Sequence, residues 1–389
     1  MKTHTILRFL LLIILTSHNL LFGQTGEPNV QHVKVYYEPG MFGGWPANHG
    51  IWQWGNEILV GFSKGYYEDL GERHNIDREK EEFHLLSRSL DGGETWTVED
   101  PGKNSGALVL PDCDFYHGTV RKDVQPPALK DCQEAINFEH PDFCLTARTT
   151  SVHAGQSRYW YSYDRGHSWE GPCRLPDFGT QGTAARTDYL INSDRECMLF
   201  ITAAKSNGRE GRPMCVRTTD GGKTWSFVSW IGPEPAGFSI MPASVRLSST
   251  EILVTVRRRE KGNRFIAAYR SGDNGPTWDR LNNPVEDTGI GNPPAMVKMR
   301  DGRICLIYGY RAEPHSSIRA RISSDNGRTW SKDYFLRDDG SGQDIGYPRV
   351  VQRPDGKIVA VYYFEDKDTG PERYIGATIW DPPEGGQEK

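Results

Sequence analysis

The chain has 389 residues, 11% of them aromatic, with 42 Gly and 24 Pro, a composition typical of many short strands joined by tight turns. Its length exceeds that of most single domains, although closed all-β folds of this length are common. The 46 basic and 51 acidic residues give a net charge of −5, which argues against a general affinity for nucleic acid or anionic membranes.

The first residues have the pattern of a secretory signal peptide. Lys2 and Arg8 flank a short stretch of Leu, Ile and Phe, and a small residue, Gly23, precedes Gln24. This apolar stretch is too short for a membrane anchor, and no Cys follows it for a lipid anchor. We therefore expect cleavage after residue 23 and a secreted or periplasmic protein, with a mature charge of about −7. No later apolar run is long enough to span a membrane.

One eight-residue pattern recurs five times: Ser or Thr, any residue, Asp, any residue, Gly, two residues, Trp. Its Asp residues are spaced by 73, 56, 53 and 52 positions, and they are Asp91, Asp164, Asp220, Asp273 and Asp325. Asp accepts hydrogen bonds from the N–H groups of a tight turn, Gly supplies the backbone angle, and Trp packs between sheets. A period near 50 residues with strand-like filling predicts a β-propeller.

Strand signals occur in six groups of three, and five of these groups are followed by one copy of the eight-residue pattern. In chain order they span residues 50–54, 58–62 and 83–88; 134–138, 143–149 and 158–163; 187–191, 197–203 and 214–217; 239–247, 252–257 and 265–269; 295–297, 304–310 and 318–322; and 347–351, 358–364 and 374–380. The last group lacks a fourth strand, which residues 33–37 are suited to supply by closing the ring. We predict one six-bladed propeller over residues 30–385, or seven blades if the insertion near 101–130 forms another.

The repeated Asp box is the BNR repeat, and on these residues the chain resembles the sialidase-like superfamily over nearly its whole mature length. The resemblance implies a three-arginine carboxylate site and a Tyr nucleophile relayed by Glu. Tyr347 resembles that nucleophile and Arg257 the second arginine. The sequence departs elsewhere: the expected relay Glu falls at Met241 and the third arginine near Asn292, so Tyr347 lacks a base.

The second strands of five groups end in cations. A basic ring around a shared mouth predicts an anionic ligand, although Lys and Arg are also ordinary at solvated strand ends. The candidate binding residues are Lys64, Arg148, Arg186, Arg257, Arg258, Arg311 and Tyr310, with Lys205 at the equivalent position of the third group. Several other aromatic residues occur near these positions, each of which alone is better explained as structural.

Four residues are candidates for chemistry: His49, Asp188, Tyr347 and Glu365, the last to polarise Tyr347. His49 lies in a segment, 44–50, that is similar to propellers which cleave rhamnose linked to glucuronate by hydrolysis or elimination. An equally good interpretation is that His49 has no catalytic role and is simply hydrogen-bonded at the start of a strand. The sequence predicts an exo-acting enzyme on a terminal acidic-sugar linkage of complex glycans; the alternatives are a sialidase with a rearranged site, a rhamnose–glucuronate hydrolase or lyase, and a glycan-binding propeller without turnover.

No metal or organic cofactor is expected, and the expected partner is an acidic glycan. The seven cysteines show no metal-ligand spacing. Cys113 and Cys132 share one loop-like segment and are able to bridge after export, whereas buried reduced cysteines are at least as good a prediction for the rest. The oligomeric state is left open.

Overall fold

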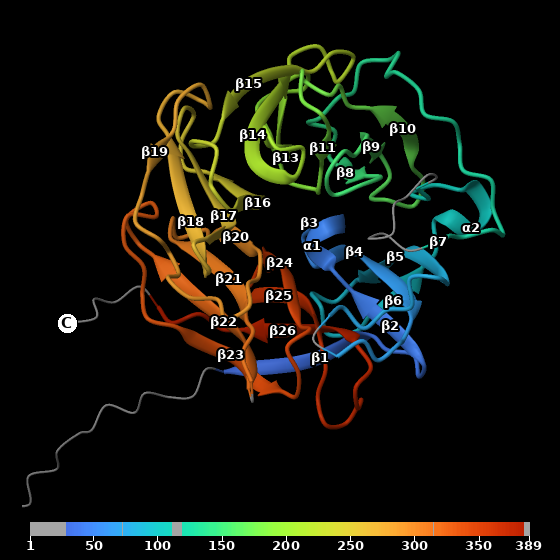
Figure 1. Ribbon diagram of the computed structural model, residues 1–389, viewed down its shortest axis with the longest axis vertical. Coiled ribbons are helices and arrows are strands. Elements are labelled where there is room, and N and C mark those ends of the chain that lie inside the picture. Colours follow the sequence, from blue (N-terminus) through green and yellow to red (C-terminus); the bar gives the residue numbers. More distant parts are fainter. Residues whose placement is uncertain (1–28, 72, 111–118, 314, 385–389) are drawn as a thin grey trace, which may run out of the picture.

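The structure, a computed structural model, describes residues 29–71, 73–110, 119–313 and 315–384. Its strands form six sheets that stand around a common centre like the blades of a wheel (Figure 1). The protein is therefore a six-bladed β-propeller, as predicted. In the part of the chain that is described, none of the helices has the length and apolar character needed to cross a bilayer.

Each blade is built from consecutive strands. Blade one contains β2 (Met41–Gly44), β3 (Ile51–Trp54), β4 (Glu57–Tyr66), β5 (Glu81–Ser89), β6 (Thr97–Glu99) and β7 (Thr119–Val120). Blade two contains β8 (Cys144–Thr149), β9 (Ser157–Ser162) and β10 (Glu170–Arg174). Blade three contains β11 (Thr183–Ala184), β12 (Tyr189–Ile191), β13 (Cys197–Ala204), β14 (Glu210–Thr218) and β15 (Ser226–Trp230).

The second half of the ring is more regular. Blade four contains β16 (Phe238–Arg246), β17 (Ile252–Glu260), β18 (Asn263–Ser271) and β19 (Asp279–Arg280). Blade five contains β20 (Pro294–Lys298), β21 (Ile304–Tyr310), β22 (Ser316–Ser323) and β23 (Tyr334–Gly340). Blade six contains β24 (Gly346–Gln352), β25 (Ile358–Phe364), β26 (Tyr374–Trp380) and β1 (Val30–Tyr36).

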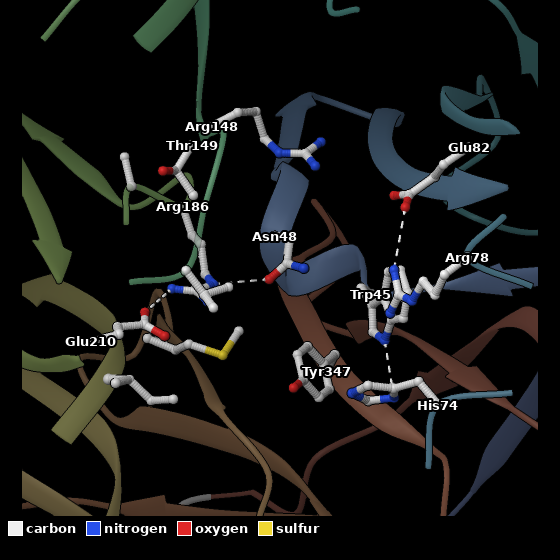
Figure 2. A pocket seen from close by; sticks show the side chains of 14 residues that line it. Trp45, Asn48, His74, Arg78, Glu82, Arg148, Thr149, Arg186, Glu210 and Tyr347 are labelled. Atoms are coloured by element: carbon white, nitrogen blue, oxygen red, sulfur yellow. Dashed lines mark hydrogen bonds and ion pairs between the residues drawn. The ribbon is translucent and has the colours of Figure 1, made fainter. Parts of the chain in front are cut away.

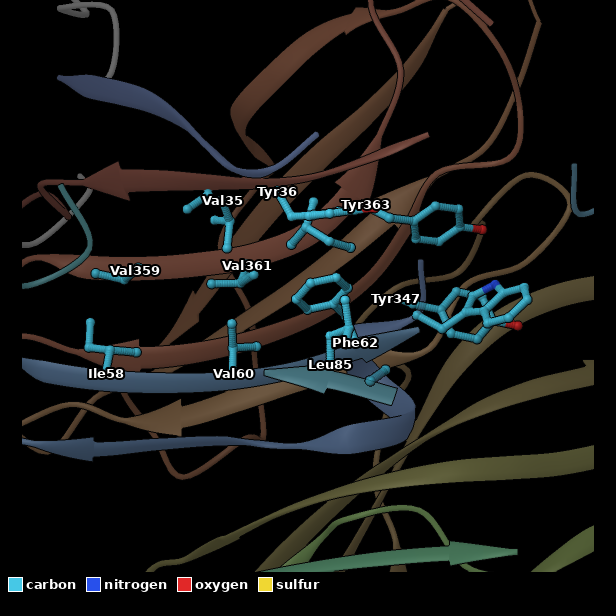
Figure 3. Close-up of a cluster of buried hydrophobic side chains, with 14 of the residues drawn as sticks. Val35, Tyr36, Ile58, Val60, Phe62, Leu85, Tyr347, Val359, Val361 and Tyr363 are labelled. Atoms are coloured by element: carbon cyan, nitrogen blue, oxygen red, sulfur yellow. The ribbon is translucent and has the colours of Figure 1, made fainter. Parts of the chain in front are cut away.

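The ring closes as the sequence predicts. Strand β1 pairs antiparallel with β26, and Val33 lies opposite Ala377. Beneath this pairing a hydrophobic cluster joins the last blade to the first, with Val361 of β25 and Val60 of β4 among its members (Figure 3). Pairing the N-terminal strand with the last sheet satisfies a backbone edge that would otherwise stay open.

The Asp boxes form the expected turns. In the first box, Oδ1 of Asp91 accepts hydrogen bonds from the N–H of Thr95 at 2.9 Å and of Glu94 at 3.0 Å. Burial opposes ionisation of Asp91, but the hydrogen bonds from Thr95 and its neighbours lower its pKa to about 2. The box Trp residues then pack on the preceding blade, as Trp278 does against Phe200 at 6.2 Å between ring centroids.

Two parts of the chain differ from the simple repeat. The predicted strand at residues 134–138 is wrong: this segment is not a strand, because its backbone binds the turns of blade three, with the N–H of Ile136 donating to Gly221 and that of Phe138 to Asp194. The insertion near 101–130 contributes the short helix α2 (Gly102–Ser105) and β7, which pairs parallel with β5. It extends blade one and does not form a seventh blade.

The described cysteines are all buried and free, which agrees with the prediction of reduced, space-filling side chains. Cys132 is one of them. Its suggested partner, Cys113, lies outside the described residues, as do residues 1–23 with the predicted signal peptide.

Candidate active site

A cavity of about 260 Å³ opens on the face where the second strands of the blades end. Blade one supplies Trp45, next to the short helix α1 (Pro46–His49), and His74, from the long connection between β4 and β5. The end of β8 supplies Arg148, and the start of β24 supplies Tyr347 (Figure 2). Loops and strand ends of several blades thus converge on one site, as the repeat register predicts.

Three bulky residues of this cavity have left-handed backbone conformations. Trp45 has φ 59°, Met241 has φ 54° and Tyr347 has φ 48°. The pairing of β16 shifts register between Ile240 and Ala243, and that of β24 shifts between Gly346 and Arg349. Bulges of this kind redirect a side chain out of the strand alternation, and strain in bulky residues is characteristic of functional sites. Met241 and Tyr347 are aimed into the cavity by this means.

Tyr347 lies against two of the predicted arginines. Nη1 of Arg257 donates to its hydroxyl at 3.1 Å, and the guanidinium of Arg311 lies 5.2 Å from its ring centroid. Its backbone N–H donates to Oδ1 of Asn292, the residue that stands near the expected third arginine. Among the described residues, no carboxylate accepts a hydrogen bond from the Tyr347 hydroxyl, so the base required by a Tyr nucleophile is missing there.

His49 and Arg148 meet, but His49 is sealed beneath the cavity. Nη1 of Arg148 donates to Nδ1 of His49 at 2.7 Å, and Nε2 of His49 contacts the Ser63 hydroxyl at 3.0 Å. Nη2 of Arg148 also donates to Nε2 of His84 at 3.1 Å, while Nδ1 of His84 donates to the Leu108 carbonyl. A guanidinium only donates, so each imidazole accepts with an unprotonated nitrogen. His49 is only 4% exposed and orients Arg148.

A second histidine, His74, faces the cavity directly. Its Nδ1 lies 2.6 Å from Oδ1 of Asp344, whose Oδ2 accepts the N–H of Asn75 at 3.1 Å. The Tyr363 hydroxyl also donates to Oδ1 of Asp344. Burial disfavours the charged Asp344, but His74, Arg373 and Arg311 outweigh it and hold its pKa below the ordinary value.

Two carboxylates in the cavity wall are paired with arginines. Nη1 of Arg186 lies 2.5 Å from Oε1 of Glu210, and its Nε donates to Oδ1 of Asn48 at 3.1 Å. Arg78 stacks over the ring of Trp45 at 4.8 Å and lies 3.6 Å from Glu82. The wall therefore combines guanidinium groups, flat rings and an apolar side (Figure 2). This arrangement suits an anionic, sugar-like ligand.

Several predicted site residues have their partners elsewhere. Lys64 pairs with Glu38, and Lys205 contacts the carbonyl of Pro235. Arg258 donates to the Tyr269 hydroxyl on the neighbouring strand. Tyr310 carries the guanidinium of Arg319 at 3.9 Å above its ring. None of these four residues lines the cavity of about 260 Å³.

Glu365 and Asp188 are buried acids outside the main cavity. Oε2 of Glu365 pairs with Nη1 of Arg373 at 2.6 Å, and burial raises the pKa of Glu365 to about 7, against the effect of Arg373. Asp188 lines a separate cavity of about 180 Å³ together with Arg349. Burial raises the pKa of Asp188 to about 7, against the effect of Arg349, and its Oδ2 has no hydrogen-bond partner among the described residues.

Sequence reasoning missed His74, Arg78, Glu82, His84 and Glu210. Two of them, His74 and Arg78, lie where a signal is visible in the sequence, since β4 and β5 are joined by the connection 67–80, which is much longer than the turn between β3 and β4. Long connections on a rigid scaffold commonly carry function. The partnership of Asp344 with His74 was not foreseeable from spacing.

Comparison with known proteins agrees with this architecture. A protein of unknown function from Dyadobacter fermentans has a similar structure, with a TM-score of 0.67 and 20% identity over 92% of this chain and 100% of that one. The phage phi92 endosialidase has a TM-score of 0.61 and 11% identity, over 93% of this chain and 71% of that one. The NanB sialidase of Streptococcus pneumoniae has a TM-score of 0.56 and 13% identity, over 89% of this chain and 68% of that one. At such identities the likeness shows the fold.

No curated protein sequence matches the chain. The family model of the BNR repeat-like domain matches residues 143–360, more than half of the chain. Together with the five boxes and the six blades, this match shows that the chain belongs to the BNR repeat-like domain family.

Proposed function

We propose that the protein is a secreted, exo-acting glycosidase that cleaves a terminal acidic-sugar linkage in complex glycans. The observation that carries the proposal is the convergence of Arg78, Arg148 and Arg186 on one cavity of about 260 Å³. Arginine suits a carboxylate because its planar fork donates two parallel hydrogen bonds. A cavity, in contrast to an open groove, favours the end of a glycan chain over its middle.

The remaining wall supports a sugar as the ligand. Trp45 and Tyr347 present flat rings, while Val152, Ile240 and Met241 form an apolar side. Sugar rings have apolar faces that pack on aromatic side chains, and the arginines are then left to the acidic group. His49 and His84 orient Arg148, because an unprotonated ring nitrogen of each accepts one of its hydrogen bonds. These nitrogen acceptors add no negative charge beside the guanidinium.

A direct test is a screen of purified protein against sialosides, rhamnosyl-glucuronate oligosaccharides and other uronate-terminated glycans. Products are followed as free sialic acid, free rhamnose, or the ultraviolet absorbance of an unsaturated uronate. We expect turnover of one acidic class and a strong preference over its carboxyl-reduced analogue. Equal turnover of the acidic and the reduced substrate would contradict the proposal.

A glycan-binding propeller without turnover is the second candidate. It is favoured by one observation: among the described residues no carboxylate is bound to the hydroxyl of Tyr347, and Met241 lines the cavity at the expected position of the relay Glu. Calorimetry separates the two candidates, because binding of an acidic glycan with no product after prolonged incubation supports a lectin. Secretion is tested separately by N-terminal sequencing of the exported protein, which we expect to begin at Gln24.

A further inference from the structure

We propose that His74, oriented by Asp344, is the general base of this cavity. The inference rests on the proposed function, since it assigns the group that takes a proton during cleavage of a glycosidic bond. The hydroxyl of Tyr347 does not fill this role, because among the described residues no carboxylate accepts its proton; its hydrogen bond with Arg257 is one that it accepts. The cavity therefore needs another proton acceptor, and His74 has the required geometry.

Asp344 fixes which nitrogen of His74 carries the proton. Its Oδ1 lies 2.6 Å from Nδ1, and the carboxylate is held from the other sides by Asn75 and Tyr363. Because the pKa of Asp344 is held below its ordinary value, the carboxylate is ionised and accepts. Nε1 of Trp45 also approaches this Nδ1, at 3.4 Å, but the contact with the carboxylate is much shorter, so Nδ1 carries hydrogen and the lone pair of a neutral imidazole is on Nε2.

Nε2 is positioned to meet a ligand. Figure 2 shows this ring nitrogen on the side of Tyr347, whose ring centroid lies 5.8 Å from that of His74. The side chain of His74 is 34% exposed and lines the cavity. Among the described residues no hydrogen bond to Nε2 is formed. In contrast, both nitrogens of His49 are engaged by Arg148 and Ser63, and His49 is 4% exposed.

The surrounding charges favour the unprotonated imidazole. Burial lowers the pKa of His74, Asp344 raises it, and Arg311 and Arg78 lower it. The lowering effects prevail, so the pKa of His74 lies below the ordinary histidine value of 6.5. Tyr347 and Tyr363 also face the ring at 5.8 and 6.5 Å between centroids. At neutral pH Nε2 is thus an acceptor, the state that a general base requires.

The step balances with water as the co-reactant. Nε2 takes a proton from a water molecule as the water oxygen forms a bond to the anomeric carbon. The glycosidic C–O bond breaks, its electron pair stays on the departing oxygen, and that oxygen takes a proton from solvent. The imidazolium, stabilised by Asp344, then returns its proton to solvent.

The test uses full-length H74A and H74Q, with H167A as the matched histidine control on an exposed Asp-box turn. We expect H74A to lower kcat by about 10²–10⁴-fold with little change in KM, and azide, which needs no deprotonation, to restore a large part of the lost rate. Melting curves check that the variants are folded.

The outcomes are distinguishable. A wild-type protein that cleaves no acidic glycan overturns the proposed function. An active wild type with H74A within about threefold of its kcat, or with a loss that azide does not relieve, overturns the role of His74 alone. A readout independent of activity is ¹⁵N NMR of His74, which we expect to show the Nδ1–H tautomer in the wild type and its loss in D344N.

Discussion

Nδ1 of His74 and Oδ1 of Asp344 are 2.6 Å apart although 270 residues separate them in the chain. His74 belongs to the connection within blade one, and Asp344 immediately precedes β24 of blade six. The pair therefore spans the junction at which the ring closes, and the site depends on that closure.

The first prediction concerns ring closure. A chain that begins at Glu38 lacks β1 and leaves the edge of β26 unpaired, so we expect a lower urea midpoint or aggregation compared with a chain that begins at Asn29. If the shorter chain does not fold, V35A offers a milder change, with an expected loss of about 1.5 kcal/mol from its buried side chain. Unchanged midpoints for both variants would contradict the role of β1.

The second prediction concerns Asp344. D344N preserves shape but removes the charge that orients His74, so kcat should fall at least about tenfold. Activity of the wild type should decline as pH falls through the pKa of His74, which lies below 6.5, because the neutral imidazole is the active form. Asp344 raises that pKa, so in D344N the acid limb should move to lower pH. An acid limb at the same pH would speak against the partnership.

The third prediction concerns recognition of the carboxylate by Arg148. R148Q removes a charged donor from the cavity, and we expect kcat/KM for the acidic glycan to fall by about 10–100-fold, corresponding to about 1.5–3 kcal/mol. The carboxyl-reduced glycan should be affected much less. R258Q is the matched control, because Arg258 donates to Tyr269 outside the cavity and should leave both substrates unchanged.

The fourth prediction concerns Asp188. Its folded-state pKa is raised to about 7 by burial, so the ionised carboxylate destabilises the fold at high pH. This cost is absent below the unfolded-state value near 3.8, grows as pH rises, and is complete above about 7. D188N should therefore melt at a higher temperature than the wild type at pH 8, by about 2 °C for each 1 kcal/mol relieved, and at nearly the same temperature at pH 4. D194N, at an exposed acid, is the control for loss of charge.

The sequence by itself determined the propeller and the closing strand, and it favoured six blades over seven, because the signals involved are local. An Asp box makes its own turn within eight residues, and strand alternation is apparent within one hairpin. The same locality explains the one wrong strand: residues 134–138 have an ordinary strand pattern, but their backbone bonds to blade three.

Only the tertiary structure decided which polar residues form the site. The register placed Arg148, Arg257 and Arg311 at the mouth, but it placed Lys64 and Arg258 there equally, and their partners Glu38 and Tyr269 direct them away. Three features distinguish these equivalent positions: hydrogen-bond partners on other blades, the left-handed backbone at Met241 and Tyr347, and burial. Such effects depend on distances across the closed ring, which spacing along the chain does not encode.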